Sequence, residues 1–182
     1  MTDSSDSSSA SLSGALTRQI RERVEDAGGW LGFDQFMALA LYSPGLGYYA
    51  NERPKFGSMP ASGSDFVTAP EISPAFGRLL AAQVSEAMER TDTREVWEFG
   101  AGTGALAEQL LATLGDKVER YTIVDLSGSL RARQKERLAP FADKLHWADA
   151  LPDSMQGVVV GNEVLDAMPV QLLMRKKGEW FE

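Results

Sequence analysis

The sequence predicts an α/β fold built on a Rossmann-like parallel sheet, preceded by a helical cover. Short apolar runs recur at 96–99, 121–124 and 157–161, separated by segments with helical spacing, and this alternation is typical of a parallel sheet. A glycine turn at 100–104 follows the first run and leads into a helix-like segment. Glycines there permit left-handed backbone and close approach to a ligand, as in nucleotide-binding turns.

The segment before the sheet is predicted to be mainly helical. Leu16, Ile20 and Val24 recur at helical spacing up to a glycine pair suited to ending a helix. A second short helix is expected over 35–41, a loop over 51–64, and a further helix starting at Ser73 and Pro74. We therefore divide the chain into a disordered serine-rich tail (1–14), a helical and loop cover (15–93) and an α/β domain (94–182).

Within the α/β domain, the order of elements follows from the same patterns. After the glycine turn come a helix, a strand at 121–124, a helix at 127–138, a strand at 145–147 and a strand at 157–161. Polar residues gather where these strands end, and open α/β sheets bind their ligands there. A last hairpin is expected from a strand at 170–175, a turn at 176–178 and a short returning strand at 179–182. We expect the sheet to be incomplete at its C-terminal side.

The spacing of the glycine turn distinguishes between ligands. Dinucleotide folds use G-x-G-x-x-G, whereas here Glu98 precedes Gly100, Gly102 and Gly104 in the pattern E-x-G-x-G-x-G. This pattern resembles the first motif of class I S-adenosylmethionine-dependent methyltransferases. The methionine part of that cofactor carries an ammonium and a carboxylate, which suit a strand-end carboxylate beside glycine-lined backbone. The alternative is a purely structural glycine turn.

Three further polar residues at strand ends are candidate cofactor ligands. Asp125 follows the second strand about twenty residues past the last glycine, where α/β nucleotide folds place a carboxylate for the ribose hydroxyls. Its alternative role is to cap the helix of 127–138. Asp149 could accept a hydrogen bond from the adenine amine, or start a turn. Asn162 could hold the cofactor or the acceptor by its amide, or be a simple turn residue.

Three long motifs make a family resemblance specific. They are Y-S-P-G-L-G-Y-Y at 42–49, G-S-D-F-V-T-A-P-E-I-S-P-A-F-G at 63–77 and G-N-E-V-L-D-A-M-P-V at 161–170. Together they resemble the signatures of the MidA family of methyltransferases, from about Leu16 onward. The resemblance implies S-adenosyl-L-methionine as cofactor and a protein substrate bearing arginine. Since that family continues well beyond this length, it also implies that the chain is the N-terminal part of a longer protein.

For an arginine acceptor, carboxylates must orient the guanidinium and localise its charge. Glu163 and Asp166 are the best candidates for this catalytic role, and a spacing of three would place both on one face of a helical turn. The alternative is that they satisfy free N–H groups where a helix starts. Tyr42, Tyr48 and Tyr49 either form an aromatic lid over the sulfonium or pack as part of the cover. In the resemblance, Asp65, Thr68 and Glu71 of the second motif could reach the cofactor ammonium.

Composition excludes several other functions. The net charge of −8 argues against a nucleic-acid partner. The chain has no cysteine and one histidine, His146, so a thiolate nucleophile, a histidine triad or a metal centre is not expected. No apolar run is long enough to span a membrane. The serine-rich, acidic start resembles neither a transit peptide nor a signal peptide, which favours a bacterial cytoplasmic protein.

The sequence favours a protein arginine methyltransferase and leaves two rivals open. One is a methyltransferase of another acceptor class. The other is a non-catalytic assembly factor that keeps the fold as a cofactor-binding module. A nicotinamide-dependent dehydrogenase is a weaker rival, because the glycine spacing does not match its motif. The oligomeric state is not predicted.

Overall fold

The computed structural model describes residues 4–51, 67–125 and 128–182. The chain divides into two compact units, one formed by Met1–Arg53 with Asp166–Glu182 and the other by Pro54–Leu165. This division differs from the predicted boundary between residues 93 and 94. The reason is that the helices just before the sheet pack on the sheet domain itself.

The first unit contains two helices in contact, α1 (Ser4–Asp26) and α2 (Phe33–Tyr42). The structure differs from the predicted disordered tail over 1–14, because α1 begins at Ser4. Once the apolar stripe of a helix is packed, each additional residue adds one hydrogen bond at little cost, so a helix extends into sequence of weak propensity. As predicted, α1 ends before a glycine pair, and Gly28 and Gly29 have φ of 80° and 97°. The predicted loop over 51–64 lies almost entirely outside the described residues.

The first unit also contains a hairpin of β5 (Met174–Lys176) and β6 (Glu179–Phe181). Its turn is confirmed: Lys177 and Gly178 have φ of 52° and 90°, the left-handed pair that favours a two-residue hairpin turn. The predicted strand start at residue 170 is wrong. Phe181 pairs with Met174, so the residues before Met174 have no partner in this hairpin.

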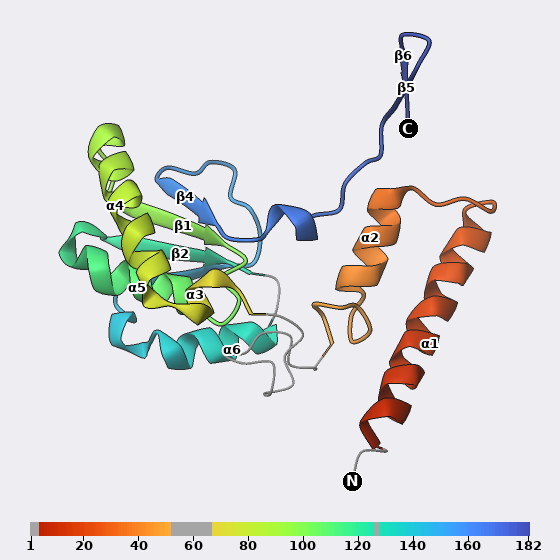
Figure 1. Cartoon of the computed structure of the whole chain (residues 1–182), viewed down its shortest axis with the longest axis horizontal. Coiled ribbons are helices and arrows are strands. Elements are labelled where there is room, and N and C mark those ends of the chain that lie inside the picture. The colour runs from red at the N-terminus through yellow and green to blue at the C-terminus, as the bar shows by residue number, and fades with distance from the viewer. Residues whose placement is uncertain (1–3, 52–66, 126–127) are drawn as a thin grey trace. The chain divides into compact units, whose positions relative to one another are not determined.

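The second unit is a four-stranded parallel sheet with helices packed on it. Its strands are β1 (Glu95–Phe99), β2 (Arg120–Val124), β3 (Leu145–Ala148) and β4 (Val158–Gly161). Their order is β3-β2-β1-β4, and Figure 1 shows β4, β1 and β2 side by side. The chain therefore moves outward from β1 to β3 and then returns to the other side of β1. Open sheets of this kind bind ligands where the strand order reverses.

In the described part of this unit, four α-helices accompany the sheet. They are α3 (Ala69–Ile72), α4 (Pro74–Thr91), α5 (Ala105–Leu114) and α6 (Gly128–Arg137). As predicted, Ser73 caps α4, accepting a hydrogen bond from the Ala75 N–H at 3.2 Å. The core brings apolar residues of α4 and α5 against the sheet, with Val84, Leu110 and Tyr121 among its buried members. Burial of such side chains supplies the main stabilisation.

Strand register sets which residues meet at the carboxyl edge of the sheet. Phe99 pairs with Val124 on one side and with Gly161 on the other, and Val124 pairs with Ala148. The residues that follow these four strand ends lie along one edge. Across the described ranges, no helix is both long and apolar enough to cross a membrane.

Candidate functional site

The glycine turn leaves β1 in the predicted conformation. Gly100, Gly102 and Gly104 have φ of 61°, 55° and 86°, a region that side-chain-bearing residues rarely adopt. The Gly100 N–H donates to the Val124 carbonyl at 3.1 Å, which fixes the turn beside the end of β2. A Cβ on Gly100 would stand 3.0 Å from a Val164 methyl group, so the turn also has little room on that side.

Helix α5 begins directly after this turn. Gly104 occupies the N-cap position and has no side chain to satisfy the first N–H groups of the helix. Free N–H groups at a helix start attract anionic groups such as a carboxylate. The turn and the start of α5 therefore fit the carboxylate of an amino-acid-bearing cofactor.

Glu98 lies in the core rather than on the surface of the turn. It shares the helix-covered face of β1 with Val96, and its side chain is 1% exposed. The Tyr121 hydroxyl donates to its carboxylate at 2.7 Å. Burial raises the pKa of Glu98 to about 7, and the charge of Asp125 adds to the rise, while the Tyr121 hydrogen bond opposes it. Strand alternation points the side chain toward the core, and the contact of Glu98 with the cofactor ammonium stays a prediction.

Asp125 lies at the end of β2, next to the glycine turn, and is half-buried. Its carboxylate accepts a hydrogen bond from Gln134 Nε2 at 2.8 Å. Its backbone carbonyl accepts one from Arg131 Nη2 at 3.4 Å. The position is the one predicted for the ribose-binding carboxylate. The capping alternative involves residues 126 and 127, which lie outside the described residues.

Asp149 follows β3 along the same edge. Its carboxylate forms an ion pair with Arg131, and its side chain is 82% exposed. Because Arg131 also contacts the Asp125 carbonyl, the two aspartates are linked through one guanidinium. The predicted contact of Asp149 with adenine would have to compete with this ion pair and with water.

Asn162 and Glu163 follow β4, on the other side of β1. Asn162 is half-buried and Glu163 is exposed. Glu163 has a left-handed backbone, with φ of 54°, and the helical segment that follows is a short 3-10 turn, η4 (Leu165–Ala167). The predicted helical turn carrying Glu163 and Asp166 on one face is therefore wrong, because a left-handed residue cannot continue a right-handed helix. Asp166 is exposed within η4, and the catalytic role of both carboxylates stays a prediction.

A charged network that the sequence did not reveal ties α3 to the glycine turn. Arg137 at the end of α6 donates to Glu71 at 3.1 Å and to the Thr103 hydroxyl at 2.7 Å. Its Nε donates to Glu108 at 2.8 Å. Thr103 also donates to Glu71. Glu71 is thus engaged by Arg137 and Thr103, which holds α3 against the turn. The contact of Thr68 and Glu71 with the cofactor ammonium stays a prediction, and Asp65 lies outside the described residues.

A second missed residue is Gln134, whose amide is fully buried between the turn, β2 and β3. A signal was available: Leu130, Gln134 and Leu138 recur at helical spacing, so Gln134 interrupts an apolar stripe.

The three tyrosines of the first unit form a cluster of their own. Tyr42 and Tyr49 are stacked with ring centroids 5.7 Å apart, and Tyr48 meets Tyr49 edge to face at 4.9 Å. The Tyr42 hydroxyl donates to the Ala167 carbonyl at 2.7 Å. These contacts are those of the packing alternative, and the lid over the sulfonium stays a prediction.

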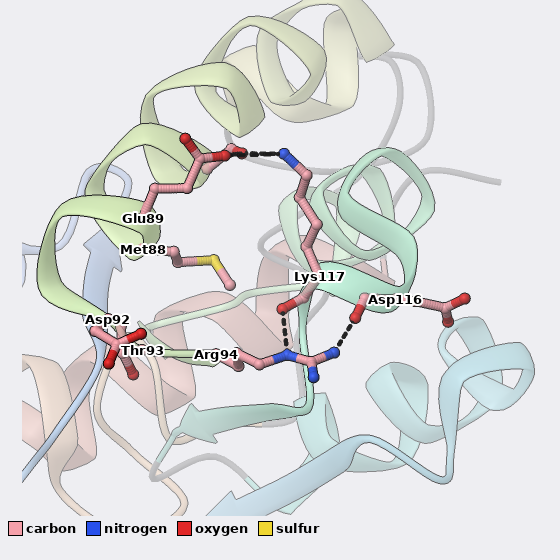
Figure 2. A pocket seen from close by; sticks show the side chains of 8 residues that line it. Met88, Glu89, Asp92, Thr93, Arg94, Asp116 and Lys117 are labelled. Carbon is pink, nitrogen blue, oxygen red and sulfur yellow. Dashed lines mark hydrogen bonds and ion pairs between the residues drawn. The ribbon is translucent and has the colours of Figure 1, made fainter.

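A pocket of about 500 Å³ lies at the opposite edge of the sheet, before β1 and β2 begin (Figure 2). Its cationic side chains are held by neighbours. Arg94 donates to the carbonyls of Asp116 and Lys117, and Lys117 binds Glu89 at 3.1 Å and Ser85 at 2.7 Å. The pocket therefore has no part in the candidate site. In the part of the chain that the structure describes, no group of three or more acidic or histidine side chains is placed to hold a metal ion.

Comparison with known proteins identifies the family of this chain. A family model described as "Putative S-adenosyl-L-methionine-dependent methyltransferase" matches residues 79–182. The protein arginine methyltransferase NDUFAF7 of Danio rerio is 26% identical, over 96% of this chain and 47% of its own length. The homologous protein of Drosophila melanogaster is 30% identical, over 93% and 44%. The chain spans about half the length of these curated relatives.

A solved structure from Burkholderia thailandensis, bound to S-adenosyl-homocysteine, is also similar. It is 50% identical with a TM-score of 0.83, and the match covers 93% of this chain and 46% of that one. A second structure from the same organism is 46% identical with a TM-score of 0.75. The fold and the resemblance predicted from the motifs are thereby confirmed. The chain belongs to the MidA family of S-adenosyl-L-methionine-dependent methyltransferases.

Proposed function

We propose that this chain carries the cofactor-binding half of a methyltransferase that transfers a methyl group to an arginine of a protein substrate. The cofactor assignment rests on one observation: the glycine turn, Asp125 and Asn162 follow the ends of three neighbouring parallel strands and so lie at one edge of the sheet. Two of these groups suit particular parts of S-adenosyl-L-methionine: the N–H groups at the start of α5, next to the turn, suit its carboxylate, and Asp125 suits its ribose hydroxyls. The half-buried Asn162 offers an amide beside β1.

When bound, S-adenosyl-L-methionine supplies a methyl group activated by a sulfonium. The residues of this chain contribute alignment, because a displacement of this kind needs the two reacting atoms in line and close together. The left-handed glycines let the backbone lie against the cofactor. The Arg137 network holds α3 against Thr103, which stiffens the turn from its outer side.

The arginine acceptor is supported by the names of the relatives and by the carboxylates after β4. The relatives from Danio rerio and Drosophila melanogaster are named protein arginine methyltransferases. A guanidinium is protonated below about pH 12, so carboxylates are needed to orient its fork and localise its charge. Glu163 and Asp166 are exposed carboxylates that follow the strand bordering β1. We assign them to the acceptor rather than to the cofactor.

The test is transfer of labelled methyl groups by the full-length protein to bacterial proteins, followed by identification of the labelled residue. We expect label on arginine, and loss of label when that arginine is replaced by lysine, since an ammonium lacks the planar fork. Glu163→Gln and Asp166→Asn should each lower transfer far more than cofactor affinity. Glu119→Gln changes an exposed carboxylate at the opposite edge of the sheet and should leave both unchanged.

Two outcomes would replace the proposal. Label on another residue type or on nucleic acid would indicate a methyltransferase of a different acceptor class. Cofactor binding without transfer to any cellular protein would indicate a non-catalytic assembly factor.

A further inference from the structure

Gln134 is a fully buried amide that contacts three residues at the carboxyl edge of the sheet. It lies on the inner face of α6 and is 0% exposed. Its Nε2 donates to the Gly102 carbonyl at 2.9 Å and to the Asp125 carboxylate at 2.8 Å. Its Oε1 accepts from the indole N–H of Trp147, on β3, at 3.0 Å. Both amide hydrogens and the amide oxygen are therefore used.

The chemistry of these partners allows only one orientation of the amide. A backbone carbonyl and an ionised carboxylate only accept hydrogen bonds, and an indole N–H only donates. A flipped amide would place its oxygen against the two acceptors and its NH2 group against the indole N–H, so no hydrogen bond could form. No other side chain of similar length supplies two donors and one acceptor in the same plane, so the residue type is matched to this arrangement.

An ordinary core residue would not serve here. The apolar residues at helical spacing from Gln134 are the half-buried Leu130 and the buried Leu138, which directly follows α6. Burying an amide among apolar side chains is unfavourable unless its hydrogen bonds are made. The compensation comes from Gly102 and Asp125, which are both predicted to bind the cofactor.

We propose that Gln134 is a positioning residue of the cofactor site, and that it sets the recognition of the ribose hydroxyls. By holding one carboxylate oxygen of Asp125, it fixes the plane of that carboxylate relative to the glycine turn, whose Gly102 carbonyl it holds at the same time. A carboxylate accepts about four hydrogen bonds, so the bond from Gln134 is compatible with bonds from the ribose. This inference rests on the assignment of Asp125 to the ribose.

The inference is tested by comparing two ligands in four proteins. The ligands are S-adenosyl-homocysteine and its analogue lacking both ribose hydroxyls, and their dissociation constants are measured by calorimetry. The proteins are the wild type, Gln134→Met, Asp125→Ala and the control Leu114→Ala. Methionine matches glutamine in length but removes the donors, and Leu114 is a buried residue at the far end of α5.

In the wild type, loss of the hydroxyls should weaken binding roughly ten- to a hundredfold, as for hydrogen bonds to a charged group. The measured ratio is the dissociation constant of the analogue divided by that of S-adenosyl-homocysteine. In Gln134→Met this ratio should fall to a few-fold, and in Asp125→Ala it should fall to about one, because the carboxylate that binds the hydroxyls is absent. Leu114→Ala should lower stability but keep the wild-type ratio. A wild-type ratio in Gln134→Met, with the ratio lost in Asp125→Ala, overturns the role of Gln134 and leaves the ribose assignment standing. A wild-type ratio in Asp125→Ala overturns the ribose assignment and the inference with it.

Gln134→Glu provides a second test that preserves the shape of the side chain. It replaces the donor group by an acid facing Asp125, so a like charge would meet the carboxylate. Affinity for S-adenosyl-homocysteine should fall more than affinity for the analogue without hydroxyls. Equal losses for the two ligands in a folded Gln134→Glu variant would contradict the inference.

Discussion

The Tyr121 hydroxyl on β2 donates a hydrogen bond of 2.7 Å to the carboxylate of Glu98 on β1, and both side chains are fully buried. Tyr121 is in register with Val96, so the two side chains lie on the same face of the sheet. Glu98 is two residues beyond Val96 on β1 and therefore points to the same face, which helices cover. Burial raises the pKa of Tyr121 well above its ordinary value, and the nearby Glu98 charge raises it further. Tyr121 therefore remains a donor, and it supports the strand that ends in the glycine turn.

The raised pKa of Glu98 predicts a specific pH dependence of stability. The neutral form is favoured in the folded state, so its contribution is fully present below the unfolded pKa of 4.5 and is lost as pH rises through about 7. A shift of this size corresponds to ~3 kcal/mol at most. Glu98→Gln keeps an acceptor for Tyr121 but does not titrate. Urea unfolding from pH 4.5 to 8 should show the variant gaining stability relative to the wild type as pH rises; parallel curves would contradict the prediction.

Gly102→Ala should abolish binding of S-adenosyl-homocysteine while leaving the fold intact. A Cβ at this position would occupy space next to the backbone that faces the cofactor, and the left-handed φ of 55° adds a strain of about 1–2 kcal/mol. Gly115→Ala is a control for an added Cβ away from the strand ends, because Gly115 has φ of 53° and no atom within 4 Å of that Cβ. The backbone of Gly115, with ψ of −126°, also strains an alanine, but only Gly102→Ala should lose binding in calorimetry. Equal binding by both variants would make the turn purely structural.

Asp125→Ala should weaken binding of S-adenosyl-homocysteine by about 1.5–3 kcal/mol, the range for hydrogen bonds to a charged group. Asp125→Asn should retain part of the affinity, because the amide keeps one acceptor. Asp149→Ala, at the neighbouring strand end, should weaken the binding free energy of S-adenosyl-homocysteine by less than about 1 kcal/mol, since this side chain is exposed and paired with Arg131. Unchanged dissociation constants for both Asp125 variants would assign Asp125 to another role.

Arg137→Met should destabilise the protein by about 2–3 kcal/mol, because it leaves Glu71 without its cationic partner. The Glu71 side chain is only 10% exposed. Adding Glu71→Gln to this variant should recover part of the loss, since the uncompensated charge is then removed. Arg90→Met breaks an exposed pair with Glu86 and should cost less than about 0.5 kcal/mol. Thermal unfolding of the three variants and the wild type measures these differences, and equal losses in Arg137→Met and Arg90→Met would refute the network.

Local patterns were sufficient to predict most of the α/β unit. The apolar runs that became β1, β2 and β4 needed only their own composition, and the turn at 100–104 needed only the conformational freedom of glycine. Asp125 and Asn162 could be assigned to one edge because parallel strands all end at the same side of a sheet. The hairpin turn at Lys177 and Gly178 was likewise local.

Contacts between distant segments could not be read from such patterns. The sequence places Glu98 at a strand end, but only the packed sheet shows that helices cover its face of β1 and bury the carboxylate. The serine-rich start gave no sign that α1 would begin at Ser4. Likewise, the left-handed backbone of Glu163 prevents the helical turn that its spacing with Asp166 suggested.

The sequence by itself determined the class of fold, the left-handed glycine turn and the strand-end residues beside it, because each depends on a short stretch of chain. Only the tertiary structure decided which side chains support them. Gln134 reaches Asp125 and Gly102, and Arg137 reaches Glu71 and Thr103, from a helix that follows the turn in sequence. Such bonds form only when β1, β2 and α6 are packed together, since their length and direction are set by the register of the sheet and not by the spacing of residues along the chain.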